Sequence, residues 1–548
     1  MVSENVAYQL QNFEEAEIDE SPVKWCSVTL SDIIARGKRL EASVYDVEAK
    51  QAREIVIHGK FPAIALGGDD GLTSSYTGAR FKRIWVDHSE YPIYQPSSIV
   101  DIKPTPDGYI SKRTDTDIDA LRVKKGQILM TCSGTIGKVA YVSDTLDGLI
   151  FSHDLLRIDS NDDNAGYIYA YLKSKIGQQI LLTNSYGAVI THIEPEHLAD
   201  VPIPNAPVEI KQEIHKMVID SYALRDESNK LLDEAMYLLV QELKLPPIEE
   251  IGVDDFVQDA PVETFLVKLS QLNNRVDASY HVPIVKAIVD YLNKNAAEVT
   301  TIGDCRISRN VILPGRFKRV YVDEGYGRIF IGGKQLGELD PTNKKYLSVT
   351  QHGERIEEQL ELHENMTLIT CSGTIGKVAL VGKHWENWTA NQHIIRVVPA
   401  NNEIAGYLSV FLSSQYGYRL ITRYTYGSVI DEIDATHVSQ IPIPILKNAE
   451  IQDRINKLAL QANQKRYETS VYKGYKQDKI EMRGDRAEMS DFPLYLNTVA
   501  GGLDRRDQTI GGFSFVVKIY ALPVVEIIGQ LLYLLGRYGF NAQFSDCL

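Results

Sequence analysis

The chain carries the same domain-sized pattern twice. The ten letters TCSGTIGKVA stand at 131–140 and recur unchanged at 370–379. Five further blocks accompany them in the same order in both halves: RLEAS and RVDAS (39–43, 275–279), RFKRIWVD and RFKRVYVD (80–87, 316–323), SYGAVI and TYGSVI (185–190, 425–430), IEPEHLADVPIP and IDATHVSQIPIP (193–204, 433–444), and VEIKQEI and AEIQDRI (208–214, 449–455). Collinear blocks of this kind exclude chance similarity. Because the period is domain-sized and occurs only twice, it predicts two modules of one fold rather than a solenoid.

Each copy begins with short apolar runs that alternate with Gly, Pro, Asn and Asp, a pattern typical of short strands joined by turns. The segment QILMTCSGTIGKVAYV at 127–142 predicts a strand, a glycine turn and a second strand. Each copy then ends in a long helical pattern. We therefore predict an α+β protein with two tandem β-rich modules, each followed by a long helix.

The helix after the first module shows a coiled-coil-like spacing. Between Pro207 and Leu245, positions four and three residues apart carry mostly apolar side chains, which predicts a seam against another helix. The positions are Ile210, Ile214, Met217, Ser221, Leu224, Ser228, Leu231, Ala235, Leu238, Glu242 and Leu245. The second copy begins likewise with Ile451, Ile455, Leu458 and Ala462, and its pattern then weakens through Lys465 and Thr469 toward Gly474.

These patterns divide the chain into seven predicted parts. They are an N-terminal extension (1–20), a first β-rich module (21–205), a first long helix (206–245), a linker (246–262), a second β-rich module (263–445), a second long helix (446–485) and a C-terminal extension of open role (486–548). In the last part an apolar run at 511–540 is interrupted by Lys518, Pro523 and Glu526. We expect a helix covered by protein there rather than a membrane span.

Composition narrows the class of protein. With 58 Lys and Arg against 73 Asp and Glu the net charge is −15, which excludes a chain that coats nucleic acid non-specifically but leaves room for a local basic face. The five cysteines are scattered without a CxxC pair, so we expect neither a disulfide framework nor a zinc site. The acidic N-terminus does not resemble a signal or transit peptide. We expect a cytoplasmic protein.

The motif SGTIGKV looks like a phosphate-binding loop but fails its requirement of Gly-x4-Gly-Lys-Ser/Thr. Cys132 stands five residues before Gly137, and a valine follows Lys138; the second copy departs in the same way. The glycines are therefore interpreted as a hairpin turn. The polar residues around them stay available for contacts: Ser133, Thr135 and Lys138, with Ser372, Thr374 and Lys377 in the second copy.

The RFKR blocks concentrate positive charge in an acidic chain. On a strand, Arg80 and Lys82 would share one face while Phe81 and Arg83 share the other. A solvated strand edge and a phosphate-contact surface both fit, and the presence of the block in both copies favours phosphate. The second block supplies Arg316, Lys318 and Arg319.

Aromatic and histidine residues recur in matching loops. Tyr186 and Tyr426 each precede a glycine, and a tyrosine there suits either stacking on bases or filling the core. His197 and His437 also match, and we expect a capping or packing role for both. Because no methyltransferase, nuclease or dinucleotide-binding motif is found, we predict no catalytic residues and no metal site.

Taken together, the duplicated TCSGTIGKVA hairpin, the YG(A/S)VI loop and the PIP segment leading into a long helix resemble the specificity subunit of type I restriction–modification systems. The resemblance covers about 20–480. It implies two target recognition domains that read a split, asymmetric site in double-stranded DNA, and an antiparallel helical spacer that docks two methylation subunits, together with a restriction/translocase subunit. It also implies that this chain needs no cofactor, since S-adenosylmethionine, ATP and Mg would serve the partner subunits, and that no membrane is involved.

On this basis we predict two sets of functional residues and keep two alternatives open. The alternatives are a single-chain DNA modification enzyme and a two-module scaffold that binds no nucleic acid. The predicted DNA contacts are Arg80, Lys82, Arg83, Ser133, Thr135, Lys138, Tyr186, Arg316, Lys318, Arg319, Ser372, Thr374, Lys377 and Tyr426. The predicted spacer and partner seam is Ile210, Ile214, Met217, Leu224, Leu231, Leu238, Ile451, Ile455 and Leu458.

Overall fold

The computed structural model describes residues 27–35, 38–160, 164–186, 191–251, 264–272, 275–341, 344–427 and 429–474. The chain divides into two compact units, Met1–Ile55 with Leu503–Leu548, and Val56–Gly502. In the first unit the described residues form α2 (Leu30–Ala35), a 3-10 turn (Ala42–Tyr45) and most of α3 (Val47–Ile57). The predicted extensions at 1–20 and 486–548 lie outside the described residues.

The second unit contains two modules with the same strand orders, β2-β9-β6-β7 with β3-β5-β4-β8, and β12-β19-β16-β17 with β13-β15-β14-β18. A two-stranded ladder completes each one, β1-β10 or β11-β20. Module 1 consists of β1 (Ala63–Ala65), β2 (Thr73–Thr77), β3 (Trp85–Val86), β4 (Pro92–Tyr94), β5 (Gly108–Ile110), β6 (Ile128–Thr131), β7 (Val139–Tyr141), β8 (Ile150–Phe151), β9 (Leu155–Ser160), α4 (Ala165–Lys173), α5 (Lys175–Thr183), α6 (Pro195–Ala199) and β10 (Pro202–Pro204). The predicted duplication is thus confirmed strand by strand.

Module 2 repeats this order and adds two helices, α8 and α9. It consists of α8 (Pro283–Asn295), β11 (Glu298–Thr301), β12 (Ser308–Ile312), β13 (Tyr321–Val322), β14 (Gly327–Ile331), β15 (Lys345–Ser348), α9 (Val349–Arg355), β16 (Thr367–Thr370), β17 (Val378–Leu380), β18 (Thr389–Ala390), β19 (Ile394–Pro399), α10 (Asn402–Ser413), α11 (Gln415–Thr422), α12 (Ala435–Ser439) and β20 (Pro442–Ile445). Where module 2 has α9 and the π turn Ile356–Leu360, module 1 has only a 3-10 turn at Asp119–Leu121. The two modules therefore differ in the connection between β5 and β6 in module 1 and between β15 and β16 in module 2.

The predicted glycine hairpin is present in both modules. In module 1, β6 pairs antiparallel with β7, and the turn between them places Gly134 at φ +71° and Gly137 at φ +84°. L side chains rarely adopt this left-handed region, so the turn requires glycine at both positions. The Thr131 hydroxyl donates to the Thr135 carbonyl (2.6 Å) and accepts from the backbone N–H of Lys138 (3.0 Å). Gly373 and Gly376 repeat the geometry in module 2.

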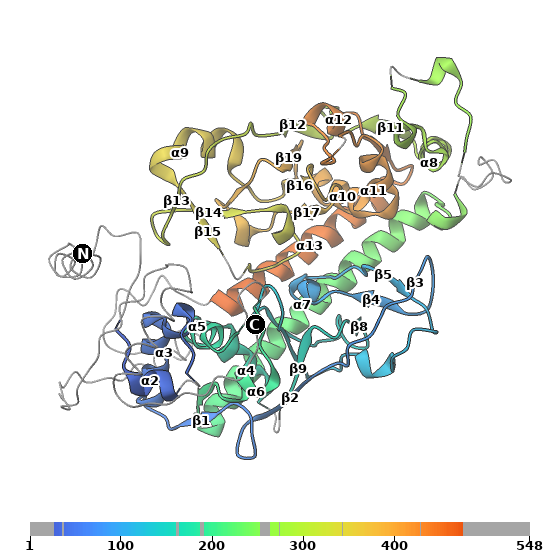
Figure 1. Ribbon diagram of the computed structural model, residues 1–548. Helices are drawn as coiled ribbons and strands as arrows, with labels where there is room; N and C mark the ends of the chain where they lie inside the picture. The colour runs from blue at the N-terminus through green and yellow to red at the C-terminus, as the bar shows by residue number, and fades with distance from the viewer. Residues whose placement is uncertain are drawn as a thin grey trace, which may run out of the picture. The chain divides into compact units, whose positions relative to one another are not determined.

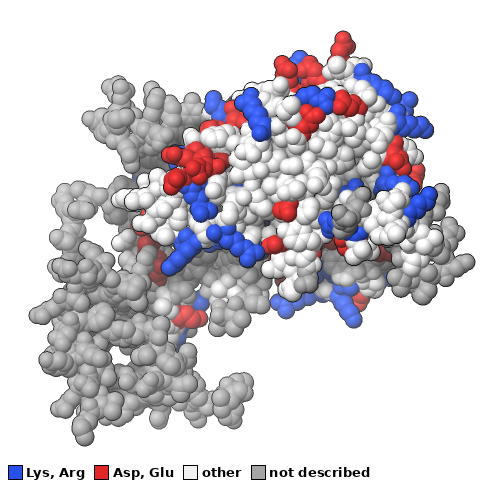
Figure 2. Space-filling view, turned by 90° about the horizontal axis from the view of Figure 1, so that it is seen from above, with Lys and Arg blue, Asp and Glu red and all other residues white. Residues whose placement is uncertain are grey.

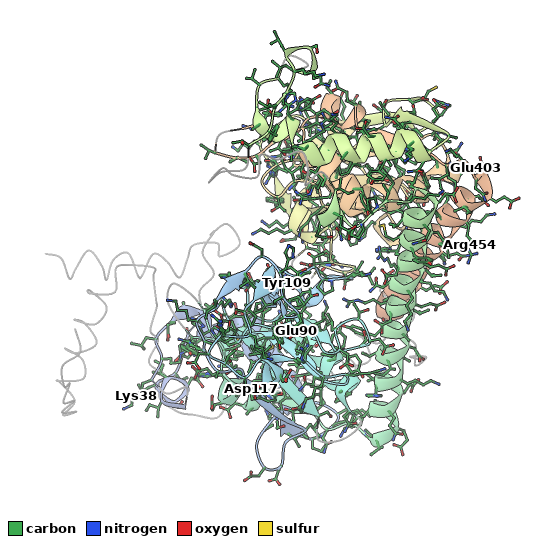
Figure 3. The ribbon with its side chains drawn as sticks, turned by 90° about the vertical axis from the view of Figure 1, so that its right-hand side faces the viewer. Lys38, Glu90, Tyr109, Asp117, Glu403 and Arg454 are labelled. Carbon is green, nitrogen blue, oxygen red and sulfur yellow. The ribbon has the colours of Figure 1, made fainter. Side chains whose placement is uncertain are left out.

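Two long helices, α7 (Val208–Glu242) and α13 (Ala449–Gly474), run side by side between the modules (Figure 1). Thr469 Oγ1 donates to the Ser221 carbonyl near one end of the contact, and Arg454 pairs with Glu234 toward the other. Figure 3 labels Arg454 on α13, beside α7. Because residue numbers rise along one helix as they fall along the other, the predicted antiparallel pairing is present.

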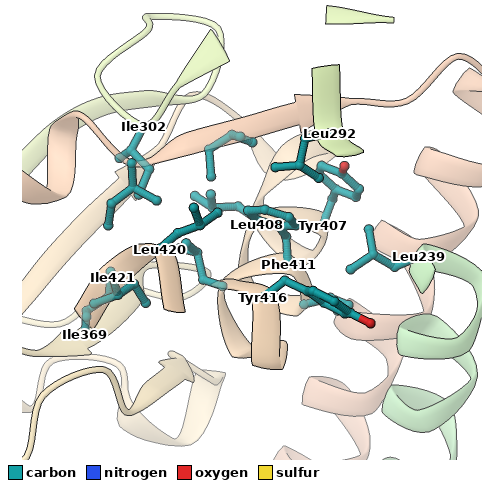
Figure 4. Packing of buried hydrophobic residues seen from close by; sticks show 14 of the residues in the cluster. Leu239, Leu292, Ile302, Ile369, Tyr407, Leu408, Phe411, Tyr416, Leu420 and Ile421 are labelled. Atoms are coloured by element: carbon teal, nitrogen blue, oxygen red, sulfur yellow. The ribbon is translucent and has the colours of Figure 1, made fainter. Parts of the chain in front are cut away.

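Helix α7 contributes to the packing of both modules. Near its middle, the Tyr222 ring lies edge-on to the rings of Tyr141 and Tyr169 of module 1, with ring centroids 5.4 and 5.5 Å apart. Its last turns carry Ala235 and Leu239 into the hydrophobic core of module 2, together with α8, α10 and α11 (Figure 4). The spacer helix is thus a part of both folded modules.

The buried stripe of α7 departs from the predicted seam. Ile214, Ser221, Ser228 and Ala235 are buried, whereas the other seam positions of this helix are only half-buried: Ile210, Met217, Leu224, Leu231 and Leu238. The physical reason is that α7 packs against α13, α4 and module 1 loops at once, so its buried surface is wider than one coiled-coil stripe. In α13, Ile455, Leu458 and Ala462 are buried and Ile451 is half-buried.

Polar residues occupy much of the buried face of α7 because they bind loop backbone and hydroxyl groups. Arg225 Nε donates to the Ile102 carbonyl (3.1 Å), and Asn229 donates to the same oxygen (2.9 Å). The Asp226 carboxylate accepts from the Ser143 hydroxyl (2.9 Å) and from the Asp144 N–H (3.1 Å). A series of apolar positions could not have indicated these contacts.

No helix among the described residues is both long enough and apolar enough to cross a membrane. The apolar run at 511–540 lies outside those residues.

The buried face of α13 predicts sensitivity to added volume. Ala462 is fully buried, and its neighbour Gln461 is exposed. We expect Ala462→Leu to lower the free energy of unfolding by about 1–3 kcal/mol, because extra methyl groups in a close-packed contact force neighbours out of place. Gln461→Leu is the matched control and should change stability by less than about 0.5 kcal/mol. Urea unfolding followed by circular dichroism measures both, and equal midpoints would contradict the packing described.

Candidate nucleic-acid interface

Two repeated blocks distant in sequence form one backbone platform in each module. In module 1 the Gly134 N–H donates to the Thr191 carbonyl (3.1 Å), and Tyr186 exchanges backbone hydrogen bonds with His192 (2.9 and 2.7 Å). Module 2 repeats the arrangement: Gly373 donates to Asp431 (2.9 Å), and Tyr426 exchanges bonds with Glu432 (3.0 and 2.8 Å). The SGT turn and the YG loop are therefore joined by main-chain bonds that do not depend on side-chain identity.

The RFKR segments lie beside these platforms. The positive charge of Arg80 acts on both Tyr186 and His153: it opposes the rise in the pKa of Tyr186 that the hydrogen bond to Glu194 causes, and it adds to the fall in the pKa of His153 that burial causes. In module 2, Arg316 forms an ion pair with Glu432 (3.2 Å), and Arg319 donates to Gln392 (2.9 Å). The structure thus brings together three sets of predicted site residues in each module.

The RFKR segments are not strands, contrary to the prediction. The strands begin later, at Trp85 in β3 and at Tyr321 in β13. The expected alternation is nevertheless present, because Arg80 and Lys82 are exposed while Phe81 and Arg83 are half-buried. Arg316, Lys318, Phe317 and Arg319 repeat the pattern. These segments are not paired with a neighbouring strand, so they lack the ladder of backbone hydrogen bonds that defines a strand.

The two platforms differ in charge. Glu432 in module 2 pairs with Arg316, whereas the bridge partner of Tyr186 in module 1 is His192. Among the described residues, neither Arg80 nor Lys82 forms an ion pair. Within the described ranges, an acidic side chain therefore neutralises Arg316 in module 2 but neither Arg80 nor Lys82 in module 1. On the face seen in Figure 2, Lys and Arg residues are interspersed with Asp and Glu, which agrees with local cationic groups on an acidic chain.

Tyr186 is held from two sides. Its hydroxyl donates to the Glu194 carboxylate, which raises the pKa of Tyr186, and its ring lies 5.1 Å from the His197 ring. His197 and His437 each close a capping box at the start of α6 and α12, so their predicted capping role is confirmed. Tyr426 is more exposed than Tyr186, and its ring lies 5.5 Å from that of His437.

The hairpin residues line a cavity of about 580 Å³ between the modules, together with residues of module 2. Ser133, Thr135 and Lys138 come from one side, and Thr374 and Lys377 from the other. The Lys138 ammonium lies 2.7 Å from the buried Glu338 carboxylate, so its charge is already engaged by an acid. Ser372 is half-buried and forms an isolated bridge with Glu432 in the module 2 platform.

Sequence reasoning missed a pair of exposed edge strands next to the RFKR segments. In β3, Trp85 is 51% exposed and the Arg83 guanidinium lies 5.9 Å from its ring. Its counterpart Tyr321 in β13 is 42% exposed, and the Lys345 ammonium lies 5.2 Å from that ring. Both strands are sheet edges. The aromatic residue two positions after RFKR in both copies was the available signal.

Sequence reasoning also missed a buried arginine in each module. Arg157 donates to the carbonyls of Leu121 and Phe151 (3.0 and 3.3 Å), and Arg396 donates to Leu360 and Ala390 among others. Burial lowers the pKa of Arg396 to about 9, so the group stays mostly protonated at neutral pH. These arginines fix the segments that carry His153 and Gln392. Their signal was an arginine in the apolar strands LLRIDS and IIRVVP.

The two cysteines beside the platforms are not activated nucleophiles. Cys132 and Cys371 are buried behind the SGT turns, and burial raises the pKa of the Cys132 thiol to about 11 and that of Cys371 to about 12. Both thiols are therefore protonated at neutral pH and are weak nucleophiles. Among the described residues, no three His, Cys, Asp or Glu side chains are grouped to hold a metal ion.

Among solved structures the chain is similar to the S subunit of a type I restriction-modification system from M. genitalium (14% identity, TM-score 0.27, covering 81% of this chain and 95% of that one). It is also similar to the HsdS subunit from Thermoanaerobacter tengcongensis (15% identity, TM-score 0.23, covering 79% and 98%). No curated protein matches.

A family model covers the same two regions as the repeat. The model for the type I restriction modification DNA specificity domain matches residues 82–234 and 325–465, which is more than half of the chain. Each match contains one SGT hairpin, one YG loop and the start of one long helix, whereas the second match begins after the RFKR segment 316–319 and strand β13. The chain therefore belongs to the type I restriction–modification DNA specificity family.

Proposed function

We propose that this chain is the subunit that selects the DNA sequence in a type I restriction–modification complex, with each module reading one half of a split target. The observation that carries the proposal is the duplicated platform. Two modules of one fold, each with its own SGT turn, YG loop and RFKR segment, are attached to one antiparallel helix pair. Paired readers joined by one helix pair suit the two half-sites of a split target on duplex DNA.

The two half-sites differ in sequence under this proposal. The main-chain bonds of the platforms are the same, but the surrounding residues are not. Module 2 has helix α9 and the pair Arg316–Glu432, where module 1 has a 3-10 turn and His192. Side chains decide which base edges are recognised, so different side chains on equal backbones favour an asymmetric target.

Chemistry is assigned to partner subunits. In the proposed complex, two methylation subunits use S-adenosylmethionine, and a restriction/translocase subunit uses ATP and Mg. This chain binds DNA and docks those partners through the exposed sides of α7 and α13. The protonated thiols behind the platforms and the capping role of His197 and His437 support a binding surface rather than a catalytic one.

Within each module, cations and aromatic rings have separate tasks. Arg80 and Lys82 are exposed and unpaired among the described residues, so they suit phosphate oxygens, which fix position without reading sequence. Trp85 presents a flat apolar face beside them and suits contact with bases or sugars. Arg316, Lys318 and Tyr321 have the corresponding tasks in module 2.

Co-expression with the methylation and restriction subunits tests the proposed function. We expect a stable complex that methylates adenines in one split, asymmetric motif, as mapped by long-read sequencing of host DNA. Methylation by the chain without partners would favour a single-chain modification enzyme. A chain that binds neither DNA nor those subunits would favour a scaffold that binds no nucleic acid.

Neutralising the module 1 cations should weaken DNA binding without changing its sequence preference. We expect Arg80→Ala with Lys82→Ala to lower affinity by a similar factor on cognate and scrambled duplexes. The salt dependence should also flatten by about 0.9 log unit per lost phosphate contact. Filter binding of the reconstituted complex across a salt series measures both quantities.

Lys125→Ala is the control for this double variant, because Lys125 is an exposed cation of module 1 that is already paired with Asp144 (2.5 Å). It should leave the salt slope unchanged. An unaltered slope in the double variant would assign the RFKR segment to a solvated edge.

Removing the edge-strand aromatic should instead affect sequence preference. We expect Trp85→Ala to lower affinity for the cognate duplex by about tenfold while leaving scrambled duplexes nearly unaffected, since one mismatched base pair in a specific site costs about 1–3 kcal/mol. Trp85→Phe keeps a ring and should retain most of the affinity. Competition binding on duplexes altered in one half-site at a time would show whether the loss maps to one half. An equal loss on all duplexes would contradict a reading role.

A further inference from the structure

The two modules contact each other directly through equivalent positions of the repeat. Asp101 follows the 3-10 turn Pro96–Val100 in module 1, and Glu338 follows the 3-10 turn Gly333–Gln335 in module 2. Asp101 and Glu338 form an isolated antiparallel bridge, and the Ile102 N–H donates to the Gly337 carbonyl (2.7 Å). The two bridged residues occupy matching positions of the repeat and pair antiparallel. The contact therefore lies on the approximate two-fold axis that relates the modules.

Gly337 packs against the Asp101 side chain at this contact. A Cβ on residue 337 would lie 2.7 Å from the Asp101 carboxylate, so a larger residue there would displace that side chain. On the opposite side, α7 holds the same segment, because Arg225 Nη2 donates to the Asp101 carbonyl and Arg225 Nε to that of Ile102. Module 2 and the spacer helix therefore clamp one short segment of module 1 between them.

Four charged side chains surround the bridge, two acids and two lysines in matching positions of the repeat. We call Asp101, Lys138, Glu338 and Lys377 the inter-module charge cluster. Lys138 is paired with Glu338 across the contact (2.7 Å), and both side chains are largely buried. Burial raises the pKa of the Asp101 carboxyl to about 6. The nearby Lys377 ammonium acts in the opposite direction and favours the ionised carboxylate. The charges of the cluster balance.

Such a contact limits motion that the helices alone would permit. A helix pair bends and twists, so modules attached only to it would sample a range of separations. A second attachment closes a rigid frame. Breaking a buried ion pair by removing one partner leaves an uncompensated buried charge, which is strongly unfavourable, so the closed arrangement resists opening.

We propose that the inter-module charge cluster holds the two modules in one mutual position and thereby restricts the DNA target to a single half-site separation. The second part of this statement rests on the function proposed above. Lys138 and Lys377 are then positioning residues, and their effect on DNA is exerted through module geometry. One base pair changes the half-site separation by roughly 3.4 Å and rotates it by roughly 35°, which a closed frame would not follow.

Charge reversal and exchange test the contact without DNA. We expect Lys138→Glu to broaden the distance distribution between the modules, and Lys138→Glu with Glu338→Lys to restore a narrow one. Spin labels on Asp117→Cys and Glu354→Cys, both exposed, report the distance by double electron–electron resonance in full-length chain. Cys26, Cys305 and Cys547 are replaced by serine in this background. Lys125→Glu, which reverses an exposed pair within module 1 (Lys125–Asp144, 2.5 Å), is the control.

The DNA arm uses duplexes with the native separation and with one base pair added or removed. We expect the reconstituted wild-type complex to prefer the native separation at least tenfold, Lys138→Glu to lose most of that preference, and the exchanged pair to regain it. A narrow distance distribution in Lys138→Glu would overturn the proposal. A broadened distribution with no binding by wild type to any duplex would instead overturn the DNA-reading function and leave the inter-module contact supported.

Discussion

The packing of helix α7 is the interaction on which the rest of this structure depends. Its middle carries Tyr222 against Tyr141 and Tyr169 of module 1, and its end carries Leu239 into the core of module 2. The two modules are therefore coupled by shared packing rather than by a flexible linker. Helix α13 completes the arrangement, because Asn456 accepts backbone N–H groups of α10 in module 2 while Thr469 reaches α7.

This coupling explains why polar groups are buried on a helix that looks like a coiled coil. Arg225, Asp226 and Asn229 face loops of module 1 whose backbone groups would otherwise be buried without partners. A buried polar group is tolerated only where its hydrogen bonds are made, so these side chains specify one position of module 1 on the helix. An apolar stripe would permit sliding, whereas directional bonds to particular carbonyls do not.

The recognition surface separates a constant framework from variable chemistry. Main-chain bonds join the SGT turn to the YG loop in both modules, and buried Arg157 and Arg396 bind carbonyls of the neighbouring segments. The side chains above that framework differ, with Trp85 and His192 in one module and Tyr321 and Glu432 in the other. A fold of this kind can change its ligand preference by substitution while its backbone stays the same.

The sequence by itself determined the duplication, the α+β class, the glycine hairpins and the two long helices. These features depend on local rules: a glycine at positive φ, the alternation of a strand, the spacing of a helix. Burial of Phe81 and exposure of Arg80 also followed from alternation, even though no strand forms there. The joint repetition of the RFKR segment, the SGT turn and the YG loop implied that they meet on one surface. The position of that surface could not be found from the sequence.

Only the tertiary structure decided which groups meet. The pairing of Lys138 with Glu338 joins residues of different modules, and nothing in the spacing of either residue indicates the other. The sequence predicted the wrong buried face of α7 because three different surfaces cover this helix. The spacing of apolar residues along a helix indicates only one buried face. The exposure of Trp85 and Tyr321 likewise depends on β3 and β13 being sheet edges, which strand order alone determines.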